Sequence, residues 1–383
     1  MDKPTVQDIF HRFYPAYLDQ YSPSPVQAKV AHNIMNCKTG AYGANVCVCE
    51  DCGFVQIHYN SCRNRCCPMC QAVPKEMWMD ARREDVLDAP YFHLVFTVPD
   101  ILNPVIYSNQ RLLYDALYHA ASSTISELTA DPKHLGAKVG YICILHTWGS
   151  EMNFHPHIHT ILLGGGLASN NQWRDNGENF FLPIRVISKM FRGKYLEELK
   201  RLWEEDKLVF HGIAEKFRNH YTFKELLDSC YGMDWIPHCK KTFNCAQTVI
   251  KYLGKYTHRI AVSNHRIVRM DDDTVTFLVK DYRNEGQWKE LTISGVEFVR
   301  RFLMHVPPRR FVRIRHYGLL CSRTKSQKLT LCRNLLGCKK YLSKLRDMEM
   351  PEILEHLYGI KVCVCKACGG HLGKPQMRMP LRC

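Results

Sequence analysis

The sequence of 383 residues predicts an α+β protein, because strand-like segments rich in β-branched and aromatic residues occur beside longer segments of helical character. Two of the strand-like segments, residues 140–148 and 154–163, are separated only by Gly149–Asn153, which favours an antiparallel hairpin. A Cys-rich segment at 37–73 has little apolar content. We therefore expect a mixed main domain with a small metal-dependent unit attached.

The elements are expected in the following order. A helical segment at 5–36 is interrupted at Ser22-Pro23-Ser24-Pro25, and a helix at 74–90 leads into the main domain. A strand at 91–98 and a helix at 106–128 precede the two hairpin strands, and Gly164-Gly165-Gly166 are expected to end the second of these strands. Helices are then expected at 188–208, 213–229 and 248–256. The last elements are a β-hairpin at 266–282 turned at Asp271-Asp272-Asp273 and a helix opened by the capping-box pattern Ser294…Glu297.

Charge and cysteine content restrict the class of protein. Lys and Arg number 52 against 37 Asp and Glu, and the net charge of +15 favours a polyanionic partner such as nucleic acid. Between Arg300 and Arg346 there is no acidic residue, which predicts a phosphate-binding surface that includes Arg313 and Arg315. The chain shows no export signal and no membrane-spanning apolar run, so its 19 Cys are expected to bind metal in a reducing compartment.

The segment FHPHIHTILL carries the strongest catalytic signal. On a strand, His157 and His159 point to the same side while Ile158 points into the core. Neutral imidazoles bind divalent ions well, so the pair is predicted to hold a catalytic metal. The third ligand is left open between His146 on the hairpin partner strand, which we prefer, and His155, whose backbone Pro156 can turn away.

The segment KYLGKYTHR supplies two phenols, Tyr252 and Tyr256, which share one face of a helix at a spacing of four. Such a pair is more often packing than chemistry, but Lys255 and Arg259 make this face cationic and able to hold phosphates. A tyrosine with a pKa of roughly 10 needs a nearby metal or Lys to act as a nucleophile at neutral pH.

Cysteine spacing predicts a structural zinc site. CEDCG and CPMC contribute Cys49 and Cys52, and Cys67 and Cys70, in two knuckles whose separation is typical of one tetrahedral Zn²⁺. Arg63 and Arg65 lie beside it and could contact a phosphate backbone. The remaining cysteines of this segment are Cys37, Cys47, Cys62 and Cys66, and a weaker C-terminal knuckle has Cys363, Cys365, Cys368 and His371, alone or with Cys338 or Cys383.

The ordered blocks CEDCGFVQIHYNSCRNRCCPMCQ, ILHTWGSEMNFHPHIHTILLGGGL, YLGKYTHRIAVSNHRIV, FLVKDYRNEG and FVRRFLMHVPPRRFVRIRHYGLL resemble rolling-circle transposases of the insertion-sequence-91 family, the two-tyrosine branch of the HUH endonucleases. The chain departs from that family at Asn45 and Cys66, where the family has His, and the change at Asn45 argues against a second zinc.

The resemblance implies a Cys-rich zinc domain followed by a central antiparallel sheet of HUH-nuclease type flanked by helices. It implies that Tyr252 and Tyr256 cleave one DNA strand at the element ends, leaving a 5′-phosphotyrosine and a free 3′-hydroxyl, with Mg²⁺ or Mn²⁺ on His157 and His159. We expect a bacterial, cytoplasmic, nucleoid-associated protein. The expected segments are an N-terminal helical segment (1–36), the zinc-binding domain with its connecting helix (37–90), the nuclease domain with the tyrosine helix (91–265), a β-hairpin and basic DNA-binding region (266–345), and a C-terminal tail with the weaker knuckle (346–383).

Two other classes compete with this interpretation. A zinc-dependent DNA-binding regulator without catalysis would account for the cysteines and the charge but leaves the HPHIH segment and the tyrosine pair unexplained. A barrel metal hydrolase would need repeated βα units, and the sequence shows no such repetition. Covalent attachment to single-stranded DNA distinguishes the transposase from both.

Overall fold

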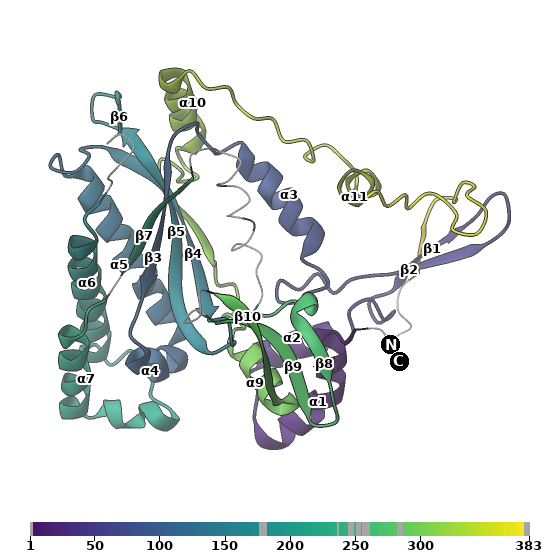
Figure 1. The fold of residues 1–383 in the computed structure, drawn as a ribbon, viewed down its shortest axis with the longest axis horizontal. Coiled ribbons are helices and arrows are strands. Elements are labelled where there is room, and N and C mark those ends of the chain that lie inside the picture. Colours follow the sequence, from purple (N-terminus) through teal and green to yellow (C-terminus); the bar gives the residue numbers. More distant parts are fainter. Residues whose placement is uncertain are drawn as a thin grey trace.

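The structure is a computed structural model that describes residues 3–175, 182–235, 237–243, 249, 254, 261–281 and 286–378. Its centre is an antiparallel sheet in the order β11-β4-β5-β3-β7, with β6 paired to β5 at one end (Figure 1). The α+β class with antiparallel pairing is confirmed. The strands of this sheet are β3 (Tyr91–Thr97), β4 (Lys138–Trp148), β5 (Phe154–Leu167), β6 (Trp173–Asp175), β7 (His238–Phe243) and β11 (Ile314–Gly318).

One face of the central sheet is covered by helices and buries the largest core. Tyr141 and Cys143 of β4 and Ile158 and Leu162 of β5 pack against apolar side chains of these helices, whereas residues of the other parity point to the opposite face. The helices on this side are α4 (Asn103–Ser108), α5 (Gln110–Ala130), α6 (Ile184–Glu204) and α7 (His220–Gly232), with the 3-10 turns Asp100–Leu102 and Gly212–Arg218 (Figure 1).

The opposite face of the sheet carries a smaller core near one end and polar side chains near the other. Ile142, Ile144 and Ile161 pack there with Leu87 and with Val249. The elements that flank this face are α3 (Ala72–Arg83) and α10 (Lys325–Leu336). The large helical layer therefore leaves this side of the sheet accessible to segments that bring functional groups.

The N-terminal helices do not stand alone. α1 (Val6–Gln20) and α2 (Pro25–Met35), each opened by a capping box, share one core with a second antiparallel sheet and with α9 (Gly295–Met304). That sheet has the order β10-β9-β8, with β8 (Ile267–Met270), β9 (Thr274–Asp281) and β10 (Gln287–Ser294). The predicted hairpin turned at the three aspartates is confirmed, whereas β10 was not predicted.

A small three-stranded sheet forms the arm at the right of Figure 1. It has the order β12-β1-β2, so the C-terminal strand β12 (Gln376–Arg378) lies beside β1 (Ala44–Val48), which pairs with β2 (Val55–Tyr59). Residues 338–363, which we call the strap, lead from α10 past α11 (Met350–Tyr358) back to this arm (Figure 1). Residues 376–378 are thus joined to residues 44–59 in one sheet.

The glycine run after the HPHIH segment does not end its strand, contrary to the sequence prediction. A Cβ on Gly165 would lie 2.4 Å from the Trp173 ring, and one on Gly166 would lie 2.4 Å from the Lys138 carbonyl oxygen. The glycines are therefore required by close approach of neighbouring strands, and β5 continues through them to Leu167. Among the described residues, no helix is both long and apolar enough to span a bilayer.

Candidate functional site

Three histidines meet on the face of the sheet that lacks the large helical layer. His157 and His159 of β5 and His146 of β4 offer ring nitrogens that all lie within 4.8 Å of one another. The Nε2 atoms of His157 and His159 are 3.0 Å apart, and all three side chains are less than 10% exposed. We call this group the histidine cluster.

Strand register explains why these side chains converge. His146 lies directly opposite His157, and Ile144 lies opposite His159, so the three imidazoles share one face of the β4–β5 pair. His146 also stacks on Trp148 of its own strand, with ring centroids 4.7 Å apart. The structure thus brings the preferred third histidine to the pair. His155 does not join the cluster and its Nδ1 lies 3.2 Å from an Asp100 carboxylate oxygen.

Neighbouring groups orient the rings of the cluster. The His157 Nδ1 lies 2.7 Å from the His155 carbonyl oxygen and must donate to it, which leaves the lone pair on Nε2 for a ligand. The His159 Nδ1 lies 2.9 Å from Nε2 of His93 on β3, a contact that directs Nε2 of His159 towards His157. Outer contacts of this kind are typical of metal-binding histidines.

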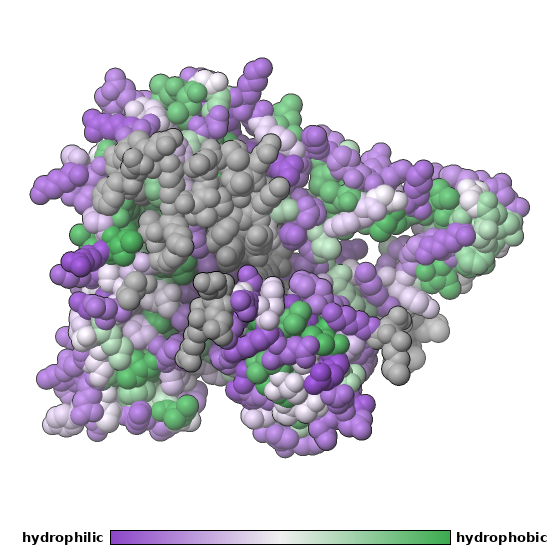
Figure 2. Space-filling model, viewed as in Figure 1, coloured by the Kyte–Doolittle hydropathy of each residue, from purple (hydrophilic) through white to green (hydrophobic). Residues whose placement is uncertain are grey.

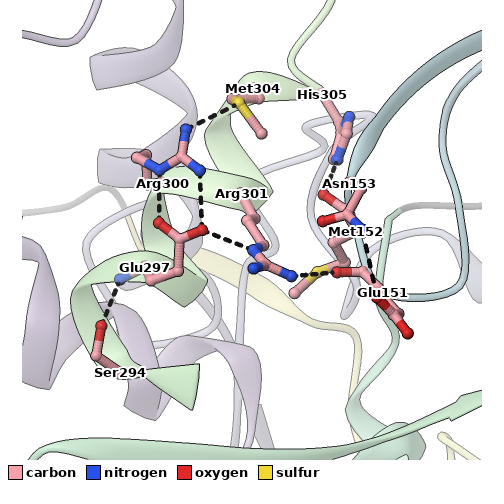
Figure 3. A network of polar contacts seen from close by, with 9 residues as sticks. All are labelled: Glu151, Met152, Asn153, Ser294, Glu297, Arg300, Arg301, Met304 and His305. Carbon is pink, nitrogen blue, oxygen red and sulfur yellow. Dashed lines mark hydrogen bonds and ion pairs between the residues drawn. The ribbon is translucent and has the colours of Figure 1, made fainter. Parts of the chain in front are cut away.

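The connection between β4 and β5 is fixed from outside by α9 (Figure 3). The Arg301 guanidinium donates to the Glu151 carbonyl oxygen at 3.0 Å, and His305 Nε2 donates to the Met152 carbonyl oxygen at 2.9 Å. Burial lowers the pKa of His305 to about 4, so the ring is neutral, and its Nδ1 lies 3.1 Å from the Thr147 hydroxyl. These contacts hold the hairpin that carries the histidines.

Glu297 connects the two arginines of α9. Its carboxylate accepts from Arg300 at 2.6 Å and from Arg301 at 2.7 Å, and these bonds lower the pKa of Glu297 to about 2. The Ser294 hydroxyl caps α9 by accepting from the Glu297 amide, which is one half of the predicted capping box. The Glu297 side chain thus turns to Arg300 and Arg301, so its charge supports the hairpin.

The predicted nucleophiles Tyr252 and Tyr256, with Lys255 and Arg259, lie outside the described residues. Two helical residues of the same segment are described. Val249 is buried with Ile142, Ile144 and Ile161, on the sheet face that carries the histidines. A Cβ on Gly254 would lie 1.8 Å from the Met79 sulfur, so the backbone there lies directly against α3.

The predicted zinc set of Cys49, Cys52, Cys67 and Cys70 is wrong as one site, because the two knuckles lie in different groups. Cys67 and Cys70 join Cys37 and Cys62, with Sγ distances of 3.3 Å from Cys37 to Cys70 and 3.5 Å from Cys62 to Cys70. We call this the inner cysteine cluster. Cys49 and Cys52 instead lie with Cys365 and Cys368, in a group that we call the cysteine clasp. Cys66 belongs to neither group.

Sequence spacing could not assign the ligands of each site. The CEDCG and CPMC knuckles have the same form, and their separation also fits one shared zinc ion. Cys37 and Cys62 were recognised as spare cysteines, and the C-terminal knuckle as a weaker candidate. The fold decides the pairing: Cys37 follows α2 into the core that also holds Cys67, whereas β12 draws the C-terminal knuckle to β1. His371, a predicted ligand, instead lies 3.5 Å from a Glu50 carboxylate oxygen.

The basic stretch between Arg300 and Arg346 does not form one surface. Several of its residues pair with acids, such as Lys325 with Asp85 at 2.8 Å. Arg315 turns inward to Asp115 and stacks over Tyr118, its guanidinium carbon 3.9 Å from the ring centre. Burial lowers the pKa of Arg313. These contacts use Arg315 within the fold, so it is a poor candidate for phosphate binding.

A groove of about 220 Å³ is lined by exposed cations, two of which come from this stretch. Among its described lining residues are Lys29, Arg65, Arg309 and Arg310 and no acid, and we call it the basic groove. Arg65 donates to the carbonyl oxygens of Phe311 at 2.6 Å and Pro308 at 3.3 Å, which ties the cysteine-rich segment to the turn that carries the other arginines. Arg63 is also exposed.

Comparison with known proteins decides the family. A family model described as "Putative transposase" matches residues 140–328, and one described as "Transposase zinc-binding domain" matches residues 9–98. A relative in Sinorhizobium fredii, "Putative transposase y4qJ", is 40% identical over 369 residues, 95% of this chain and 93% of the relative. The chain belongs to the insertion-sequence-91 family of transposases.

Further similarities extend these matches. The transposase of insertion sequence element IS801 from Pseudomonas savastanoi pv. phaseolicola is 28% identical over 308 residues, 79% of this chain and 72% of the relative. Two solved structures of the conjugative relaxase TrwC with DNA align with 45% of this transposase and 68% of the relaxase, at 16% identity and a TM-score of 0.24.

One residue of the candidate site was missed from the sequence. His93 lies in the strand YFHLVFT and contacts His159 across β3 and β5. The available signal was a polar side chain within a buried strand. His93 points to the same face of β3 as Tyr91 and Val95. The pairing of β3 with β5 could not be read from that segment alone, so the partner stayed unknown.

Proposed function

We propose that this transposase cleaves and rejoins single DNA strands at the ends of its insertion sequence, through a 5′-phosphotyrosine intermediate, during rolling-circle transposition. The observation that carries the proposal is the histidine cluster, three convergent imidazoles on a rigid antiparallel sheet. A regulator without catalysis would have no need of such a group. The setting of the reaction is then the bacterial cytoplasm, at the nucleoid.

The cluster fits a divalent cation. Its ring nitrogens share one small region, and the contact of His157 with its carbonyl partner leaves Nε2 as the available ligand atom. His146, His157 and His159 would hold the ion, Mg²⁺ or Mn²⁺, which when bound would polarise the scissile phosphate. The sheet supplies orientation: each ring is nearly buried, so little freedom is lost on binding.

Tyr252 and Tyr256 are the proposed nucleophiles. A phenol oxygen attacks phosphorus as its proton leaves, the bond from phosphorus to the 3′ oxygen breaks, and the 3′ oxygen departs as a hydroxyl. Attack by another 3′-hydroxyl reverses the step and frees the tyrosine. Support comes from Val249, which precedes Tyr252 in the sequence and whose side chain is buried on the histidine-bearing face of the sheet.

The DNA backbone is proposed to follow the basic groove. Four exposed or partly exposed cations there are contributed by α2, by the cysteine-rich segment and by the turn after α9. Such a surface attracts phosphates of any sequence, in a salt-dependent manner. Lys255 and Arg259 would add contacts beside the tyrosines, and Arg63 beside the inner cysteine cluster.

The test is covalent trapping of protein on a single-stranded oligonucleotide that spans an element end. The double variant Tyr252→Phe/Tyr256→Phe keeps both rings, so it should fold and bind DNA but give no adduct. Tyr221→Phe, which changes an exposed tyrosine of α7, should form the adduct normally and serves as the matched control. An adduct in the double variant would contradict the proposed nucleophiles.

The role of the histidine cluster is tested separately. His157→Ala removes one ligand from a sheet that is fixed by its other face, so the protein should still bind DNA. Cleavage should fall by at least about 10³-fold, since activation of the phosphate is lost. Cleavage by His157→Ala at the wild-type rate would show that the cluster is structural.

A further inference from the structure

We infer that the cysteine clasp is a second structural zinc site, which joins the cysteine-rich segment to residues 365–368. The zinc-binding domain matched at residues 9–98 includes Cys49 and Cys52 but not the other half of the clasp, Cys365 and Cys368. The inner cysteine cluster already forms a complete set of four within residues 37–70. The clasp is therefore an additional site with its own ligands.

The sulfur positions fit a tetrahedral metal. All four Sγ atoms lie within 4.8 Å of one another, with 3.5 Å between Cys49 and Cys368 and 3.7 Å between Cys52 and Cys365. A tetrahedral Zn²⁺ with Zn–S bonds of about 2.3 Å separates its sulfurs by about 3.8 Å. A disulfide would need about 2.05 Å. Four thiolates without histidine or carboxylate favour zinc over magnesium or manganese.

The two halves of the clasp have the same backbone structure although they come from opposite ends of the chain. In the first knuckle, the Cys49 amide donates to the Phe54 carbonyl at 2.9 Å, and the Gly53 amide donates to the Cys49 carbonyl at 3.1 Å. In the second, the Cys365 amide donates to the Gly370 carbonyl at 2.8 Å, and the Gly369 amide donates to the Cys365 carbonyl at 3.0 Å.

Each knuckle also ends in a glycine of positive φ, 70° at Gly53 and 79° at Gly369, where another residue would be strained. In the second knuckle, backbone amides point at the sulfurs: Ala367 donates to Cys365 and Gly370 to Cys368, both at 3.4 Å. Amides directed at sulfur stabilise thiolates, the form that binds metal. Each half is therefore built as a metal knuckle.

The arm cannot be held by apolar burial. Among the described residues of the arm, the buried apolar cluster consists of Cys47, Cys49, Cys365 and Leu372, and two of these are proposed ligands. Val55, Ile57 and Tyr59 of β2 are each at least 50% exposed, and Figure 2 shows apolar side chains on the surface of this arm. A unit with so small a core needs metal binding to supply its folding free energy.

The clasp gives the arm a second connection to the nuclease sheet. The first is α3, which leads from the cysteine-rich segment to β3. The second is the strap, which is anchored on α3 because Asp80 accepts from Tyr341 and Ser343, both at 2.6 Å (Figure 1). Metal binding at the clasp would close this loop of chain and fix the arm beside α3.

Metal content tests the site. Full-length protein purified under reducing conditions should contain two zinc ions per chain, Cys365→Ser/Cys368→Ser should contain one, and Cys363→Ser, which changes an exposed cysteine outside the clasp, should contain two. An unchanged zinc content in the double variant, or iron in place of zinc, would overturn the proposal.

A second experiment does not depend on folding of the variant. A protease site inserted between Gly359 and Ile360, after α11, lets the full protein fold and bind metal before the chain is cut there. The fragment that begins at Ile360 should remain bound after cutting and should leave when a thiol-specific reagent displaces zinc. Release before metal removal, or retention after it, would contradict the clasp. Neither readout involves DNA cleavage, so failure of the proposed function would leave this test unaffected.

Discussion

The histidine cluster and the cysteine clasp hold their side chains together by different means. The histidines lie on strands whose other face is buried by a large helical layer, and their register is set by backbone pairing. The clasp has a buried cluster of four residues and joins segments more than 300 residues apart in the chain. The sheet can therefore position its ligands before metal binds, whereas the arm depends on metal to form.

Zinc removal should separate the two regions most clearly. Structural zinc contributes about 10–16 kcal/mol in small metal-dependent domains, far more than the arm can gain from its own core. A chelator under reducing conditions should abolish amide protection in β1 and β2 but leave it in β4 and β5, as measured by hydrogen exchange with mass spectrometry. Zinc added back should restore protection. Equal loss of protection in both regions would show that the sheet also depends on zinc.

Acid should act on the hairpin that carries the histidines, through His305. Burial lowers its folded pKa from 6.5 to about 4, with a smaller contribution from Arg300 in the same direction and an opposing one from the Met152 carbonyl. Below pH 6.5, His305 becomes protonated in the unfolded chain but stays neutral in the folded protein until the pH nears 4. The free energy of unfolding therefore falls as the pH drops from 6.5 to 4, by about 2 kcal/mol at pH 5.

His305→Gln lacks this titration. It should be less stable than wild type at pH 7.5, because the contacts to Thr147 and Met152 change, but the difference should narrow by about 2 kcal/mol at pH 5. Urea unfolding at the two pH values with zinc present measures this. If the free energies of unfolding of wild type and His305→Gln fall by the same amount between the two pH values, His305 does not control the acid sensitivity.

Variants of His93 test how far the contact behind His159 contributes to metal binding by the sheet. Loss of a partner that orients a metal ligand costs about 10–100-fold in metal affinity or activity. His93→Ala should raise the Mn²⁺ concentration needed for half-maximal cleavage by that factor, and His93→Gln, whose amide oxygen can still accept from His159 Nδ1–H, should recover part of it. His119→Ala, which changes an exposed histidine of α5 away from the cluster, should leave the Mn²⁺ requirement unchanged.

Local pattern was enough to predict the histidine cluster. The strand period of two placed His157 and His159 on one face, and five connecting residues brought His146 opposite them. Strands β3, β4 and β5 and helices α5, α6 and α7 followed from the same periodicities, whereas β6, β7 and β11 of the central sheet were not predicted. β10 was not predicted because its residues are largely exposed. Gly164–Gly166 were wrongly predicted to end β5, because a glycine run indicates a turn unless the neighbouring strand is known.

Long-range pairing could not be predicted. Nothing in the knuckles CEDCG and CPMC indicates that they belong to different sites, since only the pairing of β12 with β1 brings the C-terminal cysteines to Cys49. The prediction of one phosphate-binding surface between Arg300 and Arg346 was wrong for a similar reason. The charge of this stretch was visible, but the acids that neutralise it, such as Asp85 for Lys325 and Asp115 for Arg315, lie about 200 residues or more away in the sequence.

The basic groove lies between α2, the cysteine-rich segment and the turn after α9, outside both regions, and its loss should give the smallest effect. Arg309→Ala/Arg310→Ala removes two exposed cations that are proposed to contact phosphate. The slope of log affinity against log salt for single-stranded DNA should fall by about 1.4, since each phosphate contact contributes about 0.7. All sequences should be affected alike, and cleavage of fully bound substrate should be unchanged.

Lys339→Ala/Lys340→Ala is the matched control, because both residues are exposed in the same acid-free stretch but lie on the strap, outside the groove. It should leave the slope unchanged. Arg315→Ala should behave differently again: it should lower thermal stability, because its guanidinium is held by Asp115 and Tyr118, and should not change the salt slope. If Arg315→Ala reduces the slope and the groove variant does not, the DNA backbone follows β11 instead of the groove, and charge in this stretch acts through the sheet that carries the histidines.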